Sequence, residues 1–128
     1  RLLDGGVSDP IPVKWMLSRG YEKNVVVLTR DVKYRKKANP KMQLFLKAVL
    51  HKYPAFLKDL EERHIHYNET LEELASLEKE GRIHIIRPSS PIQAAMIERD
   101  ESNLERIYQT GRADMKKDLE KLKAYLDS

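Results

Sequence analysis

The chain has 128 residues and a formal net charge of +4, and its composition is that of a globular protein long enough for one small domain with a core. It contains no cysteine, which excludes disulfides and thiolate metal sites and suits a reducing cytoplasm. No apolar run approaches the roughly 20 residues that a membrane-spanning helix needs, and no signal segment opens the chain.

The first residues place an acid at the end of an expected strand. Leu2 and Leu3 indicate the strand, Asp4 follows it, and Gly5 and Gly6 allow a sharp turn. Ligands of open α/β sheets bind outside the carboxyl ends of the strands, so this position suits a catalytic carboxylate. Taken alone, an Asp-Gly-Gly sequence is far more often a plain turn, in which the Asp side chain accepts hydrogen bonds from nearby amides. These residues alone leave both interpretations open.

A helix and a strand are predicted next. The helix runs from about Pro12 to Arg19 and is ended by Gly20. Its buried side is expected to hold Val13, Met16 and Leu17. The continuous β-branched run at 24–29 predicts a strand covered on both faces in a parallel sheet. Together with the strand expected at 2–3, these elements would form a right-handed crossover unit.

A basic loop is predicted after this strand, at the sheet edge where Asp4 is expected. Between Arg30 and Lys41 the chain carries six basic residues and one acid. Each Lys or Arg near an anionic membrane surface contributes about 1 kcal/mol of attraction. The candidate contacts to anionic lipid head groups are Lys33, Arg35, Lys36 and Lys37. A solvated loop without a partner explains the same residues, and the lack of a recognition motif argues against nucleic acid.

Two helical stretches are predicted after the basic loop. The first covers residues 41–52 and begins after Pro40. The second begins at Pro54 and is ended by Gly81. Its apolar positions recur every three or four residues, which packs one face and leaves the acids outside. Asn68 and Thr70 lower the helix propensity midway, which favours division into two helices.

The last third of the chain predicts one more strand and two more helices. The strand covers residues 82–87, and an irregular segment at 89–100 follows it. Asp100 is the expected N-cap of a helix that Gly111 terminates, and a final amphipathic helix follows. Ile83 and Ile85 are expected on one face of the strand, and Met96 and Ile97 are expected in the core.

The four histidines do not predict a metal site. On a helix, His64 and His66 point to nearly opposite sides and cannot chelate one ion together. His51 and His84 are isolated in the sequence, and no H-E-x-x-H motif joins any of the four.

A series of short motifs runs through nearly the whole chain. They are DGGVSDPIP at 4–12, NVVVLTR at 24–30, YRKK at 34–37, YP at 53–54, RH at 63–64, YNETLEEL at 67–74, IRPSSP at 86–91 and ERD at 98–100. In this order they resemble the patatin-like phospholipases, bacterial acyl hydrolases that use a serine–aspartate dyad. The resemblance implies an α/β fold, a three-layer domain with a few mostly parallel strands and several amphipathic helices. It implies that Asp4 is the catalytic dyad aspartate, that Gly5 and Gly6 form the active-site turn, and that no cofactor is needed.

The nucleophile that this resemblance requires is not in the chain. Such enzymes carry their serine in a G-x-S-x-G elbow, and this family places the elbow and a Gly-rich oxyanion loop before the aspartate. The sequence around Ser8 begins like an elbow, but Pro10 replaces the closing glycine, so Ser8 is interpreted as a turn residue. We therefore expect residues 1–128 to be the C-terminal part of a single patatin-like domain. The start at Arg1 instead of Met agrees with this expectation.

The resulting hypothesis is lipid acyl-ester hydrolysis in the cytoplasm or at the membrane periphery. Asp4 would accept the proton of a serine outside this chain, and the chain alone is expected to be inactive. The expected partners are a lipid or ester substrate, the N-terminal part of the same enzyme, an anionic membrane surface and a second copy of the chain. The alternative hypothesis is a non-catalytic helical module that binds a partner or a membrane surface.

Overall fold

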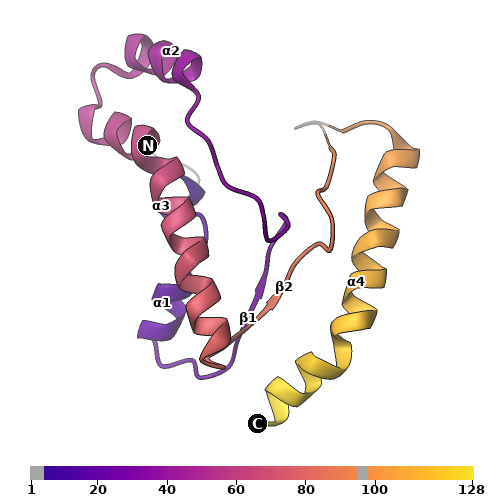
Figure 1. Ribbon diagram of the computed structural model, residues 1–128. Coiled ribbons are helices and arrows are strands. Elements are labelled where there is room, and N and C mark those ends of the chain that lie inside the picture. The colour runs from indigo at the N-terminus through magenta and orange to yellow at the C-terminus, as the bar shows by residue number, and fades with distance from the viewer. Residues whose placement is uncertain (1–4, 95–97) are drawn as a thin grey trace.

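The computed structural model describes residues 5–94 and 98–128, which form a mixed fold of helices around a small parallel sheet (Figure 1). Its elements in chain order are the 3-10 helix η1 (Gly5–Val7), α1 (Val13–Ser18), β1 (Asn24–Val27), α2 (Pro40–Leu50), α3 (Pro54–Lys79), β2 (Ile83–Ile86) and α4 (Glu101–Asp127). This agrees with the α/β class predicted from the sequence. The strand expected at Leu2 and Leu3, the expected catalytic residue Asp4, and Met96 and Ile97, which were expected in the core, lie outside the described residues.

The two strands pair in parallel, as predicted. Asn24 lies opposite Ile83, and the register continues to Val27 opposite Ile86. Both strands contain four residues instead of the expected six. Figure 1 shows α1 and α3 on one side of the strands and α4 on the other, so helices lie on both sides of the sheet.

The core lies between α1, α3 and one face of the sheet. Its buried hydrophobic side chains are Val13, Leu74, Leu77, Ile83 and Ile85. Ile83 and Ile85 therefore share the buried face, as the alternation in the sequence predicted. Among the described residues this core is small for a chain of this length.

The prediction that β1 is covered on both faces is wrong for the part of the chain that the structure describes. Val27 is 69% exposed and Val25 is 41% exposed. The reason is that α4 packs against β2, where His84 meets Asp118, and leaves the corresponding face of β1 uncovered. A cleft of about 280 Å³ runs along β1, between the strand and the beginning of α1. Its lining residues are Pro10, Ile11, Pro12, Val13, Met16 and residues 24–28.

The predicted division of the long helical stretch is also wrong, because α3 is continuous through Asn68 and Thr70. The Thr70 hydroxyl donates to the carbonyl oxygen of His66, four residues earlier, at 2.8 Å. The Asn68 side chain bonds outside its own helix, to the backbone of Lys36. Because the side-chain amide of Asn68 bonds to Lys36, this amide does not compete for the backbone hydrogen bonds of the helix.

The predicted helix end at Gly111 is wrong as well, because α4 continues from Glu101 to Asp127. A Cβ atom added at Gly111 would have no neighbour within 4 Å outside the backbone of its own helix turn, so no described residue from another element packs against this glycine. Gly20 and Gly81, by contrast, have positive φ angles of 80° and 72° and follow α1 and α3, as the sequence predicted. The predicted N-cap Asp100 is confirmed, since its carboxylate accepts hydrogen bonds from the amides of Ser102 and Asn103.

The long helices α3 and α4 are both rich in charged residues. Within residues 5–94 and 98–128, no helix combines the length and the apolar character that crossing a bilayer requires.

Candidate site around the glycine turn and the basic loop

The glycine turn is a compact 3-10 turn immediately after position 4. The carbonyl oxygen of Gly5 accepts hydrogen bonds from the amides of Ser8, at 3.1 Å, and Asp9, at 2.9 Å. The Ser8 hydroxyl donates to the same carbonyl at 3.2 Å, which agrees with its interpretation as a turn residue. The catalytic assignment of Asp4 falls on a residue outside the described part of the chain.

Arg63 of α3 fixes the glycine turn in place. Its Nε donates to the carbonyl oxygen of Gly6 at 3.0 Å. Arg63 also lines a hollow of about 150 Å³ between the turn and α3. The other lining residues are Val7, Ser8, Pro10, Asp59 and His66. The role of Arg63 could not be predicted from its neighbours in the sequence, because only the folded chain brings it to a turn 57 positions away.

The basic loop is held against the same helix by Asn68. The Lys36 amide donates to Asn68 Oδ1 at 2.8 Å, and Asn68 Nδ2 donates to the Lys36 carbonyl at 3.0 Å. The Tyr34 ring packs edge-on against the Tyr67 ring, with 6.0 Å between their centroids. These contacts give the loop a defined path along α3 although it contains no helix or strand.

Packing of the basic loop against α3 shifts the pKa of one loop residue and of one residue of α3. Partial burial, followed by the nearby charge of Arg63, lowers the pKa of Lys36. Burial also raises the pKa of Tyr67, with a further contribution from Tyr34 and an opposing one from Arg30. Lys36 therefore lies in a cationic environment, which an anion beside it would relieve.

The four residues predicted to contact anionic lipids differ in their surroundings. Lys33 and Lys37 are exposed. The Arg35 guanidinium donates to the carbonyl oxygens of Val32, at 3.1 Å, and Tyr34, at 2.8 Å, so it braces the loop itself. The Lys36 ammonium lies 5.4 Å from the centroid of the Tyr67 ring, within range of a cation–π interaction.

Arg63 connects the glycine turn with the basic loop. It lines the hollow beside the turn and also a second hollow of about 170 Å³ beside Lys36 and Lys37. The structure thus brings the predicted turn residues and the predicted lipid-contact residues to one stretch of α3. Their relation to Asp4 falls outside the described residues.

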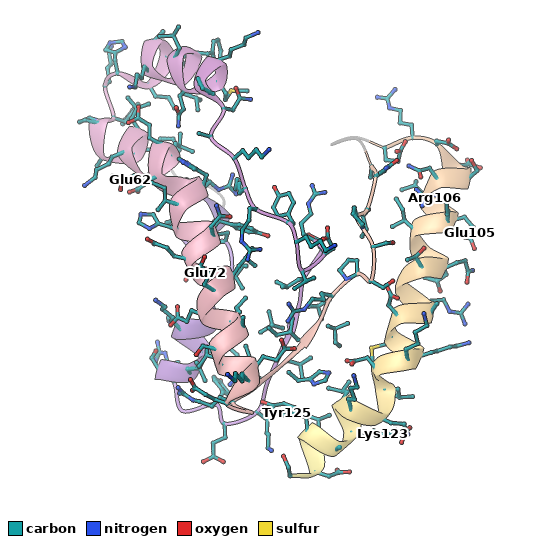
Figure 2. All side chains as sticks on the ribbon, in the orientation of Figure 1. Glu62, Glu72, Glu105, Arg106, Lys123 and Tyr125 are labelled. Atoms are coloured by element: carbon teal, nitrogen blue, oxygen red, sulfur yellow. The ribbon has the colours of Figure 1, made fainter. Side chains whose placement is uncertain are left out.

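A second cluster joins α4 to the sheet and was missed in the sequence. His84 Nε2 lies 2.5 Å from Asp118 Oδ2, and the imidazole stacks on the Tyr125 ring at 5.7 Å between centroids. The Tyr125 hydroxyl accepts a hydrogen bond from the Asn24 amide at 2.9 Å and donates to the Arg82 carbonyl at 3.0 Å. Figure 2 shows Tyr125 near the C-terminal end of α4, turned toward the starts of the strands. No local pattern could pair His84 with Asp118, which lies 34 positions later.

A cavity of about 370 Å³ lies at the carboxyl ends of the strands, where ligands of α/β sheets usually bind. In its lining, Asp114 of α4 accepts a hydrogen bond from the Ser89 amide at 2.9 Å. The walls are mostly apolar and come from β1, β2, the segment after β2 and α4. The lining residues are 27–29, 86–88, Ile92, Ile107, Thr110, Gly111, Asp114 and Met115.

The histidines take part in hydrogen bonds and ion pairs. His64 Nδ1 lies 2.9 Å from the carbonyl oxygen of Glu61, and His66 lies between Glu62, at 3.6 Å, and Glu69, at 3.2 Å. Among the described side chains, no three histidines or carboxylates gather as a metal ion would require.

These features define a mixed helix-and-sheet protein whose helix α3 carries both the glycine turn and the basic loop. Residues 53–127 match the family described as a domain of unknown function, DUF6363. The chain belongs to this family. No curated protein and no solved structure matches the chain.

The matched range divides the features just described. It contains α3, β2 and α4, and with them Arg63, Asn68 and the His84–Asp118 pair. The glycine turn and the basic loop lie upstream of residue 53. The family segment therefore supplies the groups that hold both upstream features in place.

Proposed function

We propose that this chain is the C-terminal part of a patatin-like lipid acyl hydrolase and contributes the catalytic Asp4. The observation that carries the proposal is the ordered series of sequence motifs from residue 4 to residue 100. The helices on both sides of a parallel strand pair support it, because a three-layer α/β domain requires them. The uncovered face of β1 adds support, since further strands and helices from an upstream part would cover Val25 and Val27.

In the proposed reaction, Asp4 acts as the general base. A serine from the upstream part attacks the ester carbonyl and its hydroxyl proton passes to Asp4. Asp4 then returns this proton to the alkoxide oxygen as the bond between the ester carbonyl carbon and this oxygen breaks, so the alcohol leaves and the acyl group stays on the serine. Water then hydrolyses the acyl-serine intermediate by the same route. A carboxylate with an ordinary pKa of about 3.9 is a weak base, so burial beside the serine must raise the basicity of Asp4. Arg63 is the positioning residue, because it holds the turn that follows Asp4 through Gly6.

The test uses the protein made from the complete reading frame, assayed with a lipid ester. Asp4→Asn keeps the shape of the side chain but cannot accept the proton, so activity should fall on the order of a thousandfold or more. Asp9→Asn is the matched control, since Asp9 is an exposed acid of the same turn and should leave activity within twofold. Activity of Asp4→Asn within tenfold of the unchanged enzyme would overturn the proposal.

The isolated 128-residue chain provides the complementary experiment. It should not hydrolyse p-nitrophenyl esters, because the proposed nucleophile is outside it. Turnover that is lost on Ser8→Ala would make Ser8 the nucleophile and contradict the proposed division of the active site.

The alternative function is a non-catalytic module that binds a partner or a membrane surface. The family match favours it, because the matched range begins at residue 53, downstream of Asp4. A complete reading frame that lacks a G-x-S-x-G motif, together with a protein that binds lipid without hydrolysing it, would establish the module instead.

A further inference from the structure

The half of helix α2 that is turned away from α3 is a mostly apolar face, shared with Lys41, that nothing covers in the described part of the chain. Leu44 is 72% exposed and Phe45 is 62% exposed, and Met42 and Val49 are more than half exposed. The opposite side of α2 faces α3, where Gln43 Nε2 donates to the Glu61 carbonyl at 3.4 Å. The N-terminus of α2 is capped by Asn39, whose side chain accepts a hydrogen bond from the Met42 amide at 3.1 Å.

The segment that carries this face is strongly basic. Residues 32–53, which include the part of the basic loop that follows Asp31 and all of α2, contain seven Lys or Arg residues and no acid. Lys47 has a partner, since its ammonium lies 2.9 Å from Glu61 of α3. Lys33, Lys37 and Lys41 are exposed. An apolar helix face inside a purely cationic segment is the arrangement that lies in the interface of an anionic membrane.

The position of α2 suits contact with a flat surface. Figure 1 shows α2 at one end of the molecule, over the beginning of α3 and away from the strands and α4. The helix contacts α3 among the elements that the structure describes. A planar partner could therefore reach the apolar face without displacing the sheet or α4.

We propose that the exposed face of α2, together with the basic loop, docks the protein on an anionic phospholipid bilayer. Leu44, Phe45 and Val49 enter the boundary between head groups and acyl chains, and the exposed lysines bind the lipid phosphates. A second copy is a poorer occupant, because a twofold contact through this face would bring two acid-free basic segments together. This docking surface rests on the proposed function, since it is the surface that would meet the substrate lipid. Its test measures binding without hydrolysis. Membrane docking and acyl hydrolysis can therefore fail independently of each other.

The first experiment tests charge by sedimenting the 128-residue chain with vesicles. One set contains phosphatidylcholine alone and the other contains equal parts of phosphatidylcholine and phosphatidylglycerol. Binding is expected to the anionic vesicles only and should weaken as salt is added. The triple variant Lys33→Gln, Lys37→Gln and Lys41→Gln should bind about a hundredfold more weakly. The control has the same net charge but places the changes on α4. It carries Lys116→Gln, Lys117→Gln and Lys121→Gln and should lose less than threefold.

The second experiment tests the apolar contact. Leu44→Ser combined with Phe45→Ser should weaken binding to anionic vesicles by tenfold or more, because both side chains leave water on docking. The control pair is Leu104→Ser with Tyr108→Ser, two exposed positions of α4, and should change binding less than twofold. Phe45→Trp in a Trp15→Phe background avoids any loss of folding. Its fluorescence should be quenched by lipids brominated on the acyl chain.

Three outcomes would overturn the proposal. One is that the chain binds neutral and anionic vesicles equally well, or binds neither kind. Another is an α4 charge control that weakens binding as much as the loop variant does. The last is self-association or nucleic-acid binding that requires Phe45 while vesicle binding is absent.

Discussion

The hydroxyl of Tyr125 connects three elements, and Tyr125→Phe removes that hydroxyl alone. It accepts a hydrogen bond from the Asn24 amide at the start of β1 and donates to the Arg82 carbonyl just before β2. The phenylalanine ring would keep the stacking contact with His84 and the contact with Lys23, whose ammonium lies 4.9 Å from the ring centroid. The variant therefore isolates the contribution of one polar group to the docking of α4.

The expected loss of stability in Tyr125→Phe follows from the exposure of the two hydrogen-bond partners of the hydroxyl, Asn24 and Arg82. Asn24 is only 7% exposed, so its amide would lose its partner in a buried position. Leaving a buried donor without a partner costs about 1–3 kcal/mol. Arg82 is exposed, so water can replace the hydroxyl at its carbonyl with little loss. We expect the free energy of unfolding to fall by about 1–3 kcal/mol, and the midpoint of thermal unfolding by about 4 °C for each kcal/mol.

Urea unfolding followed by circular dichroism measures this change. Tyr108→Phe is the matched control on the same helix, because Tyr108 is 58% exposed and its ring lies beside Arg112. The control should change the free energy of unfolding by less than about 0.5 kcal/mol. If the two variants were equally stable, the Tyr125 hydroxyl would not bridge the strands, and the placement of α4 against the sheet would be wrong.

Three smaller perturbations test other contacts. Gly111→Ala should raise the free energy of unfolding by about 0.5–1 kcal/mol, since this position is mid-helix with open space around it, and a loss of stability would indicate a helix break there. Asn68→Ala should lower it by about 1–2 kcal/mol and speed amide hydrogen exchange around Lys36, whereas unchanged exchange would contradict the two hydrogen bonds between them. The Ser89 amide lowers the pKa of Asp114, so the stabilisation from this carboxylate is complete above its unfolded pKa of about 3.9 and is lost as the pH falls through its lower folded value. The stability difference between the unchanged chain and Asp114→Ala should therefore shrink in acid. A difference that grew below pH ~4 would contradict a lowered pKa of Asp114 in the folded chain.

The elements that the sequence predicted correctly have local causes. Gly20 and Gly81 supply the positive φ angles that follow α1 and α3, and Asp100 supplies the side chain that caps α4. Each of these signals acts within a few residues of the backbone that it satisfies. The β-branched run that became β1 needed a partner strand, but its own composition already favoured the extended backbone.

The elements that the sequence predicted wrongly depend on distant partners. Asn68 is a poor helix former in isolation, yet its side chain is taken up by Lys36, 32 positions away, and α3 continues. A glycine such as Gly111 is typical of a helix end, but the turns of α4 on either side of it contain residues with high helix propensity. The candidate site shows the same limit, since Arg63 reaches Gly6 only after α3 has packed on the turn.

The two uncovered apolar surfaces of the described chain differ in charge, and this difference decides what can cover each. Val25 and Val27 border a cleft whose lining residues carry no charge, and among the described residues β1 pairs with β2 alone, so its other edge is suited to a further strand. A neutral strand edge with an apolar face is suited to pairing with a further strand that extends the same sheet. The face around Leu44 and Phe45 lies on a helix, whose backbone groups are already paired, within a segment that carries only positive charge. It offers a partner no backbone hydrogen bonds, only apolar contact and attraction for anions, and a lipid surface supplies both without requiring a complementary shape.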